Sequence, residues 1–300
     1  MLSSRFIKHG EDKHSSRLVK AVEDLTKQWF LQEPDGVYGA VATVICGGVT
    51  IKSWELDLEF SVPFGDNMEA DEAEIIIYNL TNDTINRFKK GVACSIEAGF
   101  RKDTGVIFSG KVDRVSTTYD GAEKITKIIC VDDVVERTIT SRTYDTSKDS
   151  EYILKDLLNE TGLPIEVFEP RKRQKYETSQ TVSGDLMENI RKYAEDCGIS
   201  VYINKGKVYA RYIKDGDNIS FTVSEKTGMI GSPIAFEEEQ QAEDFEETVD
   251  GYNIQMLLQH RITTASIVNL ESMIVSGNYR VRSGRHIFNE SEAITEIEVI

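Results

Sequence analysis

Thr227-Gly-Met-Ile-Gly-Ser-Pro233 begins the most informative part of the sequence, and Gly251-Tyr-Asn-Ile-Gln-Met-Leu-Leu-Gln-His-Arg-Ile262 continues it. Three shorter segments follow, namely Ser266-Ile-Val-Asn-Leu270, Gly277-Asn-Tyr-Arg-Val281 and Arg285-His-Ile287. Glycine, proline and asparagine mark turns between these short apolar runs, which are rich in β-branched residues. The last quarter of the chain is therefore predicted to consist of strands and turns.

The order and spacing of these segments resemble the late control D and baseplate hub family of contractile phage tails and related bacteriocins. The chain departs from the family pattern at His260, where proline is usual, and at Ala265, where glycine is usual. It also departs after His286, where Gly-Asp usually follows. The resemblance is strongest over residues 227–300 and weaker over 37–131 and 149–212.

The resemblance implies a mainly β (α+β) fold, with two tail-tube-like β-barrel domains and a small α/β domain inserted between them. It implies a structural central hub of a contractile tail baseplate, which forms a trimeric pseudo-six-fold ring between the tail tube and the central spike. The implied partners are two further copies of the chain, the tube and spike proteins, the tape measure and other baseplate proteins. The implied location is the bacterial cytoplasm during assembly and then the baseplate.

Local patterns divide the chain into four parts. Residues 15–31 are predicted to form an amphipathic helix, because apolar side chains recur at spacings of four, three and four. This stripe consists of Leu18, Val22, Leu25 and Trp29. The predicted parts are an arm over 1–35, a first β domain over 36–146, the α/β domain over 147–215 and a second β domain over 216–300, and the resemblance implies that both β domains are β-barrel domains.

The first β part follows from a period of two, because residues 55–62 alternate polar and apolar side chains as in a strand with one buried face. Further strands are predicted over 74–78, 92–100, 106–118 and 124–131. A short helix capped by Thr81 or Asn82 and a hairpin turn at Asp120-Gly121 interrupt them. Many strands with one short helix favour a closed barrel.

The predicted insert contains two helices. Ile153, Leu154, Leu157 and Leu158 form the stripe of the first, which ends at Gly162. The second begins near Ser183, ends at Gly198 and turns inward Leu186, Ile190, Tyr193, Ala194 and Cys197. A strand over 164–168 and a hairpin over 199–212 complete this domain.

The composition excludes several classes of protein. The net charge of −16, from 35 basic and 51 acidic side chains, argues against stable nucleic-acid binding. No apolar run approaches the about 20 residues of a membrane span, and the N-terminus has no signal-peptide core, so no membrane anchor is expected. Cys46, Cys94, Cys130 and Cys197 are expected to be buried thiols, without a disulfide or a metal.

No catalytic constellation is found, and we predict neither enzyme activity nor a cofactor. The four histidines form no zinc pattern, and no metal or catalytic residue is predicted. Asp132-Asp133 follows a strand and is expected to serve as a turn or cap, while His286 is expected to be a structural polar side chain.

Two charged segments are candidates for contact with partners. The basic patch 170–176 supplies Arg171, Lys172, Arg173 and Lys175, for which an acidic protein surface ranks ahead of a membrane head group or nucleic acid. A flexible loop without a binding role is a nearly equal interpretation of this patch. The acidic run 237–247 is predicted to be a solvated loop, in which Glu237, Glu238 and Glu239 would repel wrong neighbours or attract a basic spike or tube surface.

Two alternatives to a hub remain open at this point. A tail-associated cell-wall hydrolase would require an acid pair held in an apolar cleft. A β-rich adhesin or carbohydrate-binding module would display aromatic side chains in turns. Trp29 and Trp54 lie within periodic stripes, which favours core packing for both.

Overall fold

The structure is a computed structural model of the 300-residue chain, and it describes residues 39–66, 71–100, 103–132, 139–204, 206–242 and 245–300. The amphipathic helix predicted over 15–31 therefore lies outside the described residues. In the described part of the chain, no helix is long and apolar enough to cross a membrane.

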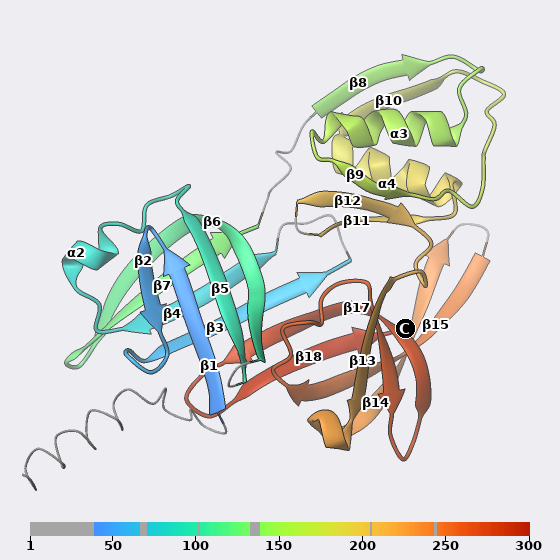
Figure 1. The fold of residues 1–300 in the computed structure, drawn as a ribbon. Coiled ribbons are helices and arrows are strands. Elements are labelled where there is room, and N and C mark those ends of the chain that lie inside the picture. The colour runs from blue at the N-terminus through green and yellow to red at the C-terminus, as the bar shows by residue number, and fades with distance from the viewer. Residues whose placement is uncertain (1–38, 67–70, 101–102, 133–138, 205, 243–244) are drawn as a thin grey trace, which may run out of the picture.

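The first β region is an antiparallel arrangement in the order β3-β4-β7-β6-β5-β1-β2 (Figure 1). Its strands are β1 (Ala40–Cys46), β2 (Val49–Lys52), β3 (Leu58–Gly65), β4 (Glu72–Tyr78), β5 (Ala93–Phe100), β6 (Asp103–Asp120) and β7 (Glu123–Val131). The short helix α2 (Asn82–Ile85) follows β4, and the Thr81 hydroxyl caps it by accepting a hydrogen bond from the Thr84 N–H. The predicted cap, the hairpin turn at Gly121 and the strands predicted over 74–78, 92–100, 106–118 and 124–131 are confirmed, whereas the strand predicted over 55–62 begins at Leu58.

The insert packs two helices between two small sheets (Figure 1). Its elements are β8 (Ile139–Tyr144), α3 (Ser150–Glu160), β9 (Ile165–Phe168), β10 (Gln180–Asp185), α4 (Leu186–Asp196), β11 (Ser200–Asn204) and β12 (Lys207–Arg211). The apolar stripes predicted for both helices are buried in one core cluster. β9 pairs with β12 in parallel, while β11 and β12 form the predicted hairpin.

One sequence prediction for the insert is wrong in detail, and one strand that packs with the insert precedes it in the sequence. Helix α4 begins at Leu186 rather than near Ser183, because Gly184 has a φ of 93° and the Asp185 carboxylate caps the N–H groups of Met187 and Glu188. Strand β8 lies ahead of the predicted boundary at residue 147, pairs with β10 and brings Tyr144 into the core of the insert. Pairing between strands so far apart leaves no local pattern in the sequence.

The last region returns to strands. It contains β13 (Asp217–Ser224), the 3-10 turn η2 (Glu225–Thr227), β14 (Met229–Ala242), β15 (Phe245–Leu257), β16 (Ser266–Glu271), β17 (Ser276–Phe288) and β18 (Ala293–Val299). β13 pairs with β16 in parallel, and the other pairs are antiparallel.

Strand β17 joins the two β regions. One of its edges pairs with β16 over residues 276–280 and then with β3 over residues 283–288, while β18 occupies the other edge. All 13 strands of the two regions thus form one hydrogen-bonded sheet. The mainly β fold class is confirmed. Among the described residues, no strand pair closes either region into a hydrogen-bonded barrel.

The cores of the two β regions share residues across the pairing of β3 with β17, which we call the β3–β17 seam. Phe288 stacks on Phe60 with ring centroids 5.4 Å apart, and Leu258 is buried in the same cluster as the first region's strands. Gly284 lies opposite Phe64, and an added Cβ would come within 2.5 Å of both the Phe64 ring and the Glu296 carbonyl. Close packing at this position therefore requires glycine.

All four cysteines are buried free thiols, as predicted. Cys46 and Cys94 face each other across β1 and β5, and Cys130 belongs to the same core cluster. Cys197 is buried with the two helices of the insert.

Candidate functional site

A buried arginine lies where the three parts of the chain meet. The Arg280 guanidinium, on β17, is 1% exposed and lies 2.6 Å from the carboxylate of Asp66, which directly follows β3. Its Nε donates a hydrogen bond of 3.0 Å to the Asp215 carbonyl, and it lies 5.4 Å from the ring centroid of Tyr202 in the insert. One side chain therefore contacts both β regions, the insert and the segment between them.

A second arginine continues this junction into the insert. The Arg211 Nη1 lies 3.0 Å from the Asp217 carboxylate, and its Nε donates a 3.0 Å hydrogen bond to the Tyr202 hydroxyl. Tyr202 and Tyr209 stack 5.2 Å apart beside the guanidinium. Burial by itself would lower the pKa of Arg211, but the hydrogen bonds to Asp217 and Tyr202 outweigh burial and raise it. Arg211 therefore stays charged at the junction.

The basic patch predicted to contact partners lies on the insert, between β9 and β10. Arg171 forms hydrogen bonds of 2.9 and 3.1 Å with the Asp215 carboxylate and stacks on Tyr212, and Arg173 donates a 2.9 Å bond to Glu151. The backbone N–H groups of Arg171 and Lys172 both donate to the Cys197 carbonyl. Lys175 is exposed and forms no ion pair with a described residue. Both arginines thus hold the patch against its own domain.

The acidic run predicted to be a solvated loop is instead a paired β-hairpin, so that prediction is corrected. Glu237, Glu238 and Glu239 lie on β14, opposite residues 248–250 of β15. Residues 236–242 and 245–251 pair with each other, and β18 joins β15 only from Tyr252 onward. In the described part of the chain, this end of the hairpin has no other strand beside it, and it extends past the sheet (Figure 1). A dense acidic sequence predicts solvation but says nothing about backbone pairing.

The strongest candidate for acid chemistry is the pair Asp71 and Asp132. Burial, with a further contribution from the Asp132 charge, raises the pKa of Asp71 from 3.8 to about 7. The Asp132 Oδ1 accepts a 3.2 Å hydrogen bond from the Asp71 N–H, which links the end of β7 to the start of β4, and both residues line a cavity of about 330 Å³. Among the described residues, no cluster of three or more His, Cys, Asp or Glu could hold a metal ion.

His286 is a structural side chain. It is 2% exposed, its Nδ1 lies 2.9 Å from the Thr295 hydroxyl, and its ring packs 4.9 Å from that of Phe64. Burial lowers the pKa of His286 to about 3, so the imidazole is neutral at physiological pH. It stabilises the β3–β17 seam as a hydrogen-bonded core residue.

Several exposed apolar side chains were not found by sequence reasoning. Met273 and Ile274 are 96% and 68% exposed in the turn between β16 and β17, where the Ser272 hydroxyl accepts from the N–H groups of Ile274 and Val275. Trp54 lies half-buried in the β2–β3 turn rather than in a core stripe. The only available signal was a pair of apolar residues between turn-forming serines, Ser272 and Ser276.

A model of the family described as Baseplate hub gp41 matches residues 55–284 of the chain. The match runs through both β regions and the whole insert, and it ends within β17. A sequence search finds no match among curated proteins.

Solved structures share this fold. The tail protein from Neisseria meningitidis MC58 is 10% identical with a TM-score of 0.59, and the match covers 87% of this chain and 96% of that one. The 43 kDa tail protein of prophage MuSo2 from Shewanella oneidensis is also 10% identical with a TM-score of 0.59, covering 86% and 96%. The Escherichia coli c3393 protein, a type VI secretion component, is 9% identical with a TM-score of 0.54, covering 82% and 73%. At these identities the likeness concerns the fold.

We expect Arg280→Met to destabilise the protein by about 3 kcal/mol, because it removes the closer partner of the buried Asp66 carboxylate and leaves, among the described residues, only the Arg282 Nε, 3.8 Å away. Arg261→Met is the matched control, since Arg261 also pairs with an aspartate, Asp103, but both side chains are about half exposed. The control should change the free energy of unfolding by about 1 kcal/mol or less. Urea unfolding measures both, and equal effects would contradict a structural role for the buried pair.

Asp71 should make stability fall as the pH rises. Its folded pKa of about 7 exceeds the unfolded value of 3.8, so between these values the folded protein holds a proton that the unfolded chain has released. The resulting stabilisation is lost as the pH rises through 7. When the pH is raised from 5.5 to 8, we expect the free energy of unfolding of Asp71→Asn to increase relative to that of the wild type by about 1–2 kcal/mol. If the free energies of unfolding of the variant and the wild type change with pH by the same amount over this range, the raised pKa is contradicted.

Proposed function

The chain belongs to the baseplate hub gp41 family, and from this membership we propose that it forms the central ring of a contractile tail baseplate and joins the tail tube to the central spike. A structural role in the tail baseplate follows from the family itself. The ring would contain three copies, whose six β regions would surround one axis with pseudo-six-fold symmetry. The family match over residues 55–284 carries this proposal.

The architecture supports such a role in two ways. The two β regions are parts of one sheet, so each copy would present two tube-like units in a fixed relation. The polar junction at Arg280 and Arg211 is buried, so it fixes this relation without occupying the outer surface. Recognition of a tube above and a spike below requires rigid, complementary surfaces rather than reactive side chains. The proposal accordingly includes no catalysis and no cofactor.

We further propose two surfaces for partner contact. The projecting end of the β14–β15 hairpin, with Glu237, Glu238 and Glu239, would meet a basic surface on a neighbouring copy or on the tube or spike protein. The basic patch on the insert would meet an acidic one. Assembly would occur in the bacterial cytoplasm, with the tape measure and other baseplate proteins joining the same complex.

The hydrolase alternative has one observation in its favour, namely that Asp71 and Asp132 line one cavity and the pKa of Asp71 is raised to about 7. A protonated acid beside a second carboxyl group is what glycoside hydrolysis requires. Two hydrogen bonds give the pair a structural role instead, since the Asp71 N–H donates to the Asp132 carboxylate and the Asp132 N–H donates to the Asp71 carbonyl. Release of peptidoglycan fragments by the wild type, lost in Asp71→Asn, would establish the hydrolase; we expect no release.

The trimer can be tested by measuring the native mass of the purified chain. We expect light scattering to approach three times 33.8 kDa as the concentration rises, and negative-stain images of the same sample to show rings. If the chain is a monomer at every concentration, addition of the spike protein should produce the trimer. A monomer in both conditions would contradict the ring.

The basic patch can be tested by replacing Arg171, Lys172, Arg173 and Lys175 with serine. We expect this variant to retain its fold and to bind the spike or another baseplate protein at least several-fold more weakly in a pull-down. The control variant carries only Arg171→Ser and Arg173→Ser, which removes the internal ion pairs with Asp215 and Glu151 but leaves both lysines. Unchanged binding by the fourfold variant would remove the patch as a contact surface.

A further inference from the structure

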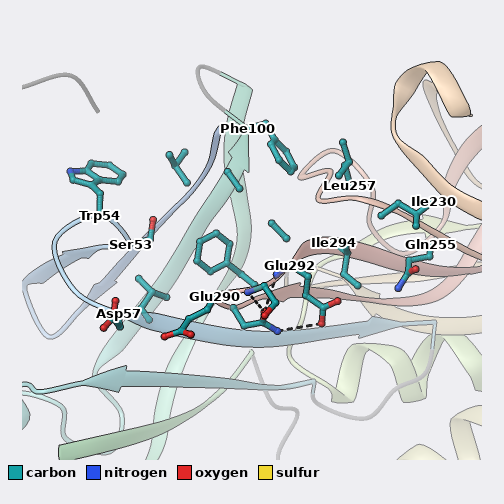
Figure 2. A pocket seen from close by; sticks show the side chains of 17 residues that line it. Ser53, Trp54, Asp57, Phe100, Ile230, Gln255, Leu257, Glu290, Glu292 and Ile294 are labelled. Carbon is teal, nitrogen blue, oxygen red and sulfur yellow. Dashed lines mark hydrogen bonds between the residues drawn. The ribbon is translucent and has the colours of Figure 1, made fainter. Parts of the chain in front are cut away.

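An apolar groove of about 470 Å³ lies between the two β regions, on the seam made by β17 and β3. Phe100 and Leu58 line it from the first region, and Ile230, Leu257 and Ile294 line it from the last. Figure 2 shows Phe100, Leu257, Ile230 and Ile294 beside the groove, with Trp54 in the turn at one end. Its volume is within the range of about 300–1,000 Å³ typical of pockets that hold a ligand.

Hydrogen bonds fix the polar side of the groove, whereas apolar side chains on its other side are partly exposed. The β17–β18 turn is fixed by the Asn289 carboxamide oxygen, which accepts hydrogen bonds of 2.8 and 2.9 Å from the N–H groups of Ser291 and Glu292. Ile230 and Leu257 are each 40% exposed, and Trp54 is half-buried. Neighbouring exposed apolar side chains along a groove indicate a surface that is covered by another segment or partner.

We propose that this groove is the docking site of the chain's own N-terminal amphipathic segment, residues 15–31. The described chain begins at Gly39, and the next two residues, Ala40 and Val41, are themselves part of the groove wall. Only residues 32–39 separate the segment from this point, and eight residues reach at most about 29 Å. The segment is thus tethered at the groove at a high effective concentration.

The segment has the apolar side chains that the groove requires. Leu18, Val22, Leu25 and Trp29 recur at helical spacing. If helical, the 17 residues from 15 to 31 extend about 25 Å, so that two turns of the stripe could lie along the groove. Docking would cover Ile230, Leu257 and Trp54, and it would place one helix across both β regions.

Charge supports the same occupant. The residues that line the groove include three acids, Asp57, Glu290 and Glu292, and neither lysine nor arginine. The segment 15–31 carries three Lys or Arg against two Asp or Glu, a net charge of +1; residues 1–31 together carry +2, so residues 32–300 carry −16 − 2 = −18. The N-terminal segment is therefore a basic part of an otherwise acidic chain, and an acidic rim attracts it. This inference concerns packing within one chain and does not depend on the proposed hub function.

Tryptophan fluorescence tests the docking directly, because the chain contains only two tryptophans. Trp29→Phe leaves Trp54, on the groove wall, as the single reporter. In this background we expect Leu25→Ser to shift the Trp54 emission to longer wavelength, whereas Lys20→Arg on the polar face, which keeps the positive charge, should leave it unchanged. Equal spectra for the two variants would overturn the proposal.

The groove offers its own matched pair of variants. Ile230 and Ile234 are both exposed isoleucines on β14, but only Ile230 lines this groove. Ile230→Ser should produce the same emission shift as Leu25→Ser, and Ile234→Ser should not. Both side chains are exposed, so neither substitution should unfold the protein.

Crosslinking distinguishes the chain's own segment from that of another copy. The four native cysteines are buried, so Gln28→Cys with Ser291→Cys would place two accessible thiols on the segment and on the groove rim. We expect a short bismaleimide to join them within one chain, in several-fold higher yield than for Gln28→Cys with Glu177→Cys on the insert. Crosslinks only between chains would assign the groove to a neighbouring copy's segment. Crosslinks in neither form would leave the groove without this occupant, and both results would overturn the proposal.

Discussion

The structure depends on how the edge of strand β17 is divided. Its first half is paired by β16 and its second half by β3, although β3 belongs to a region more than 200 positions earlier in the chain. Where β17 changes its partner from β16 to β3, the carboxylate of Asp66, directly after β3, forms an ion pair with the Arg280 guanidinium on β17. The sheet can continue from one region into the other only if this change of partner occurs at one fixed register.

A buried ion pair is a costly way to fix that register, since both charges lose their hydration. Here the cost is partly offset by additional partners, because Arg280 also donates to the Asp215 carbonyl and lies against the Tyr202 ring, while its Nη2 is buried without a hydrogen bond to the described residues. Arg211 extends the same arrangement through Asp217 and Tyr202. Buried ion pairs can often be replaced by apolar side chains without loss of stability, so the distinctive property of this junction is the directionality of its hydrogen bonds. The polar junction favours a single geometry of β regions and insert.

Local sequence patterns predicted the local structure well. The stripes of α3 and α4, the Thr81 cap, the turn at Gly121 and the buried cysteines all follow from side chains within a few residues of one another. What the patterns missed depends on distant pairing. From the sequence alone, β8 is assigned to the first β region, because its pairing with β10 leaves no pattern within β8 itself. The pairing of β3 with β17 likewise leaves no pattern in either strand alone. The family resemblance, rather than periodicity, supplied the larger architecture.

The candidate contact surfaces also show what cannot be predicted from local sequence patterns. The charge of a segment predicts that it is exposed, but it does not indicate whether the charge is available to a partner. Arg171 and Arg173 are both exposed, yet each is already paired with an acid of the same chain. The acidic run, in contrast, lies on a hairpin whose end has no other strand beside it in the described part of the chain. Availability is therefore set by the fold: an internal partner reduces what the arginines can offer, whereas the projection of the hairpin brings its backbone to where a neighbouring protein can reach it.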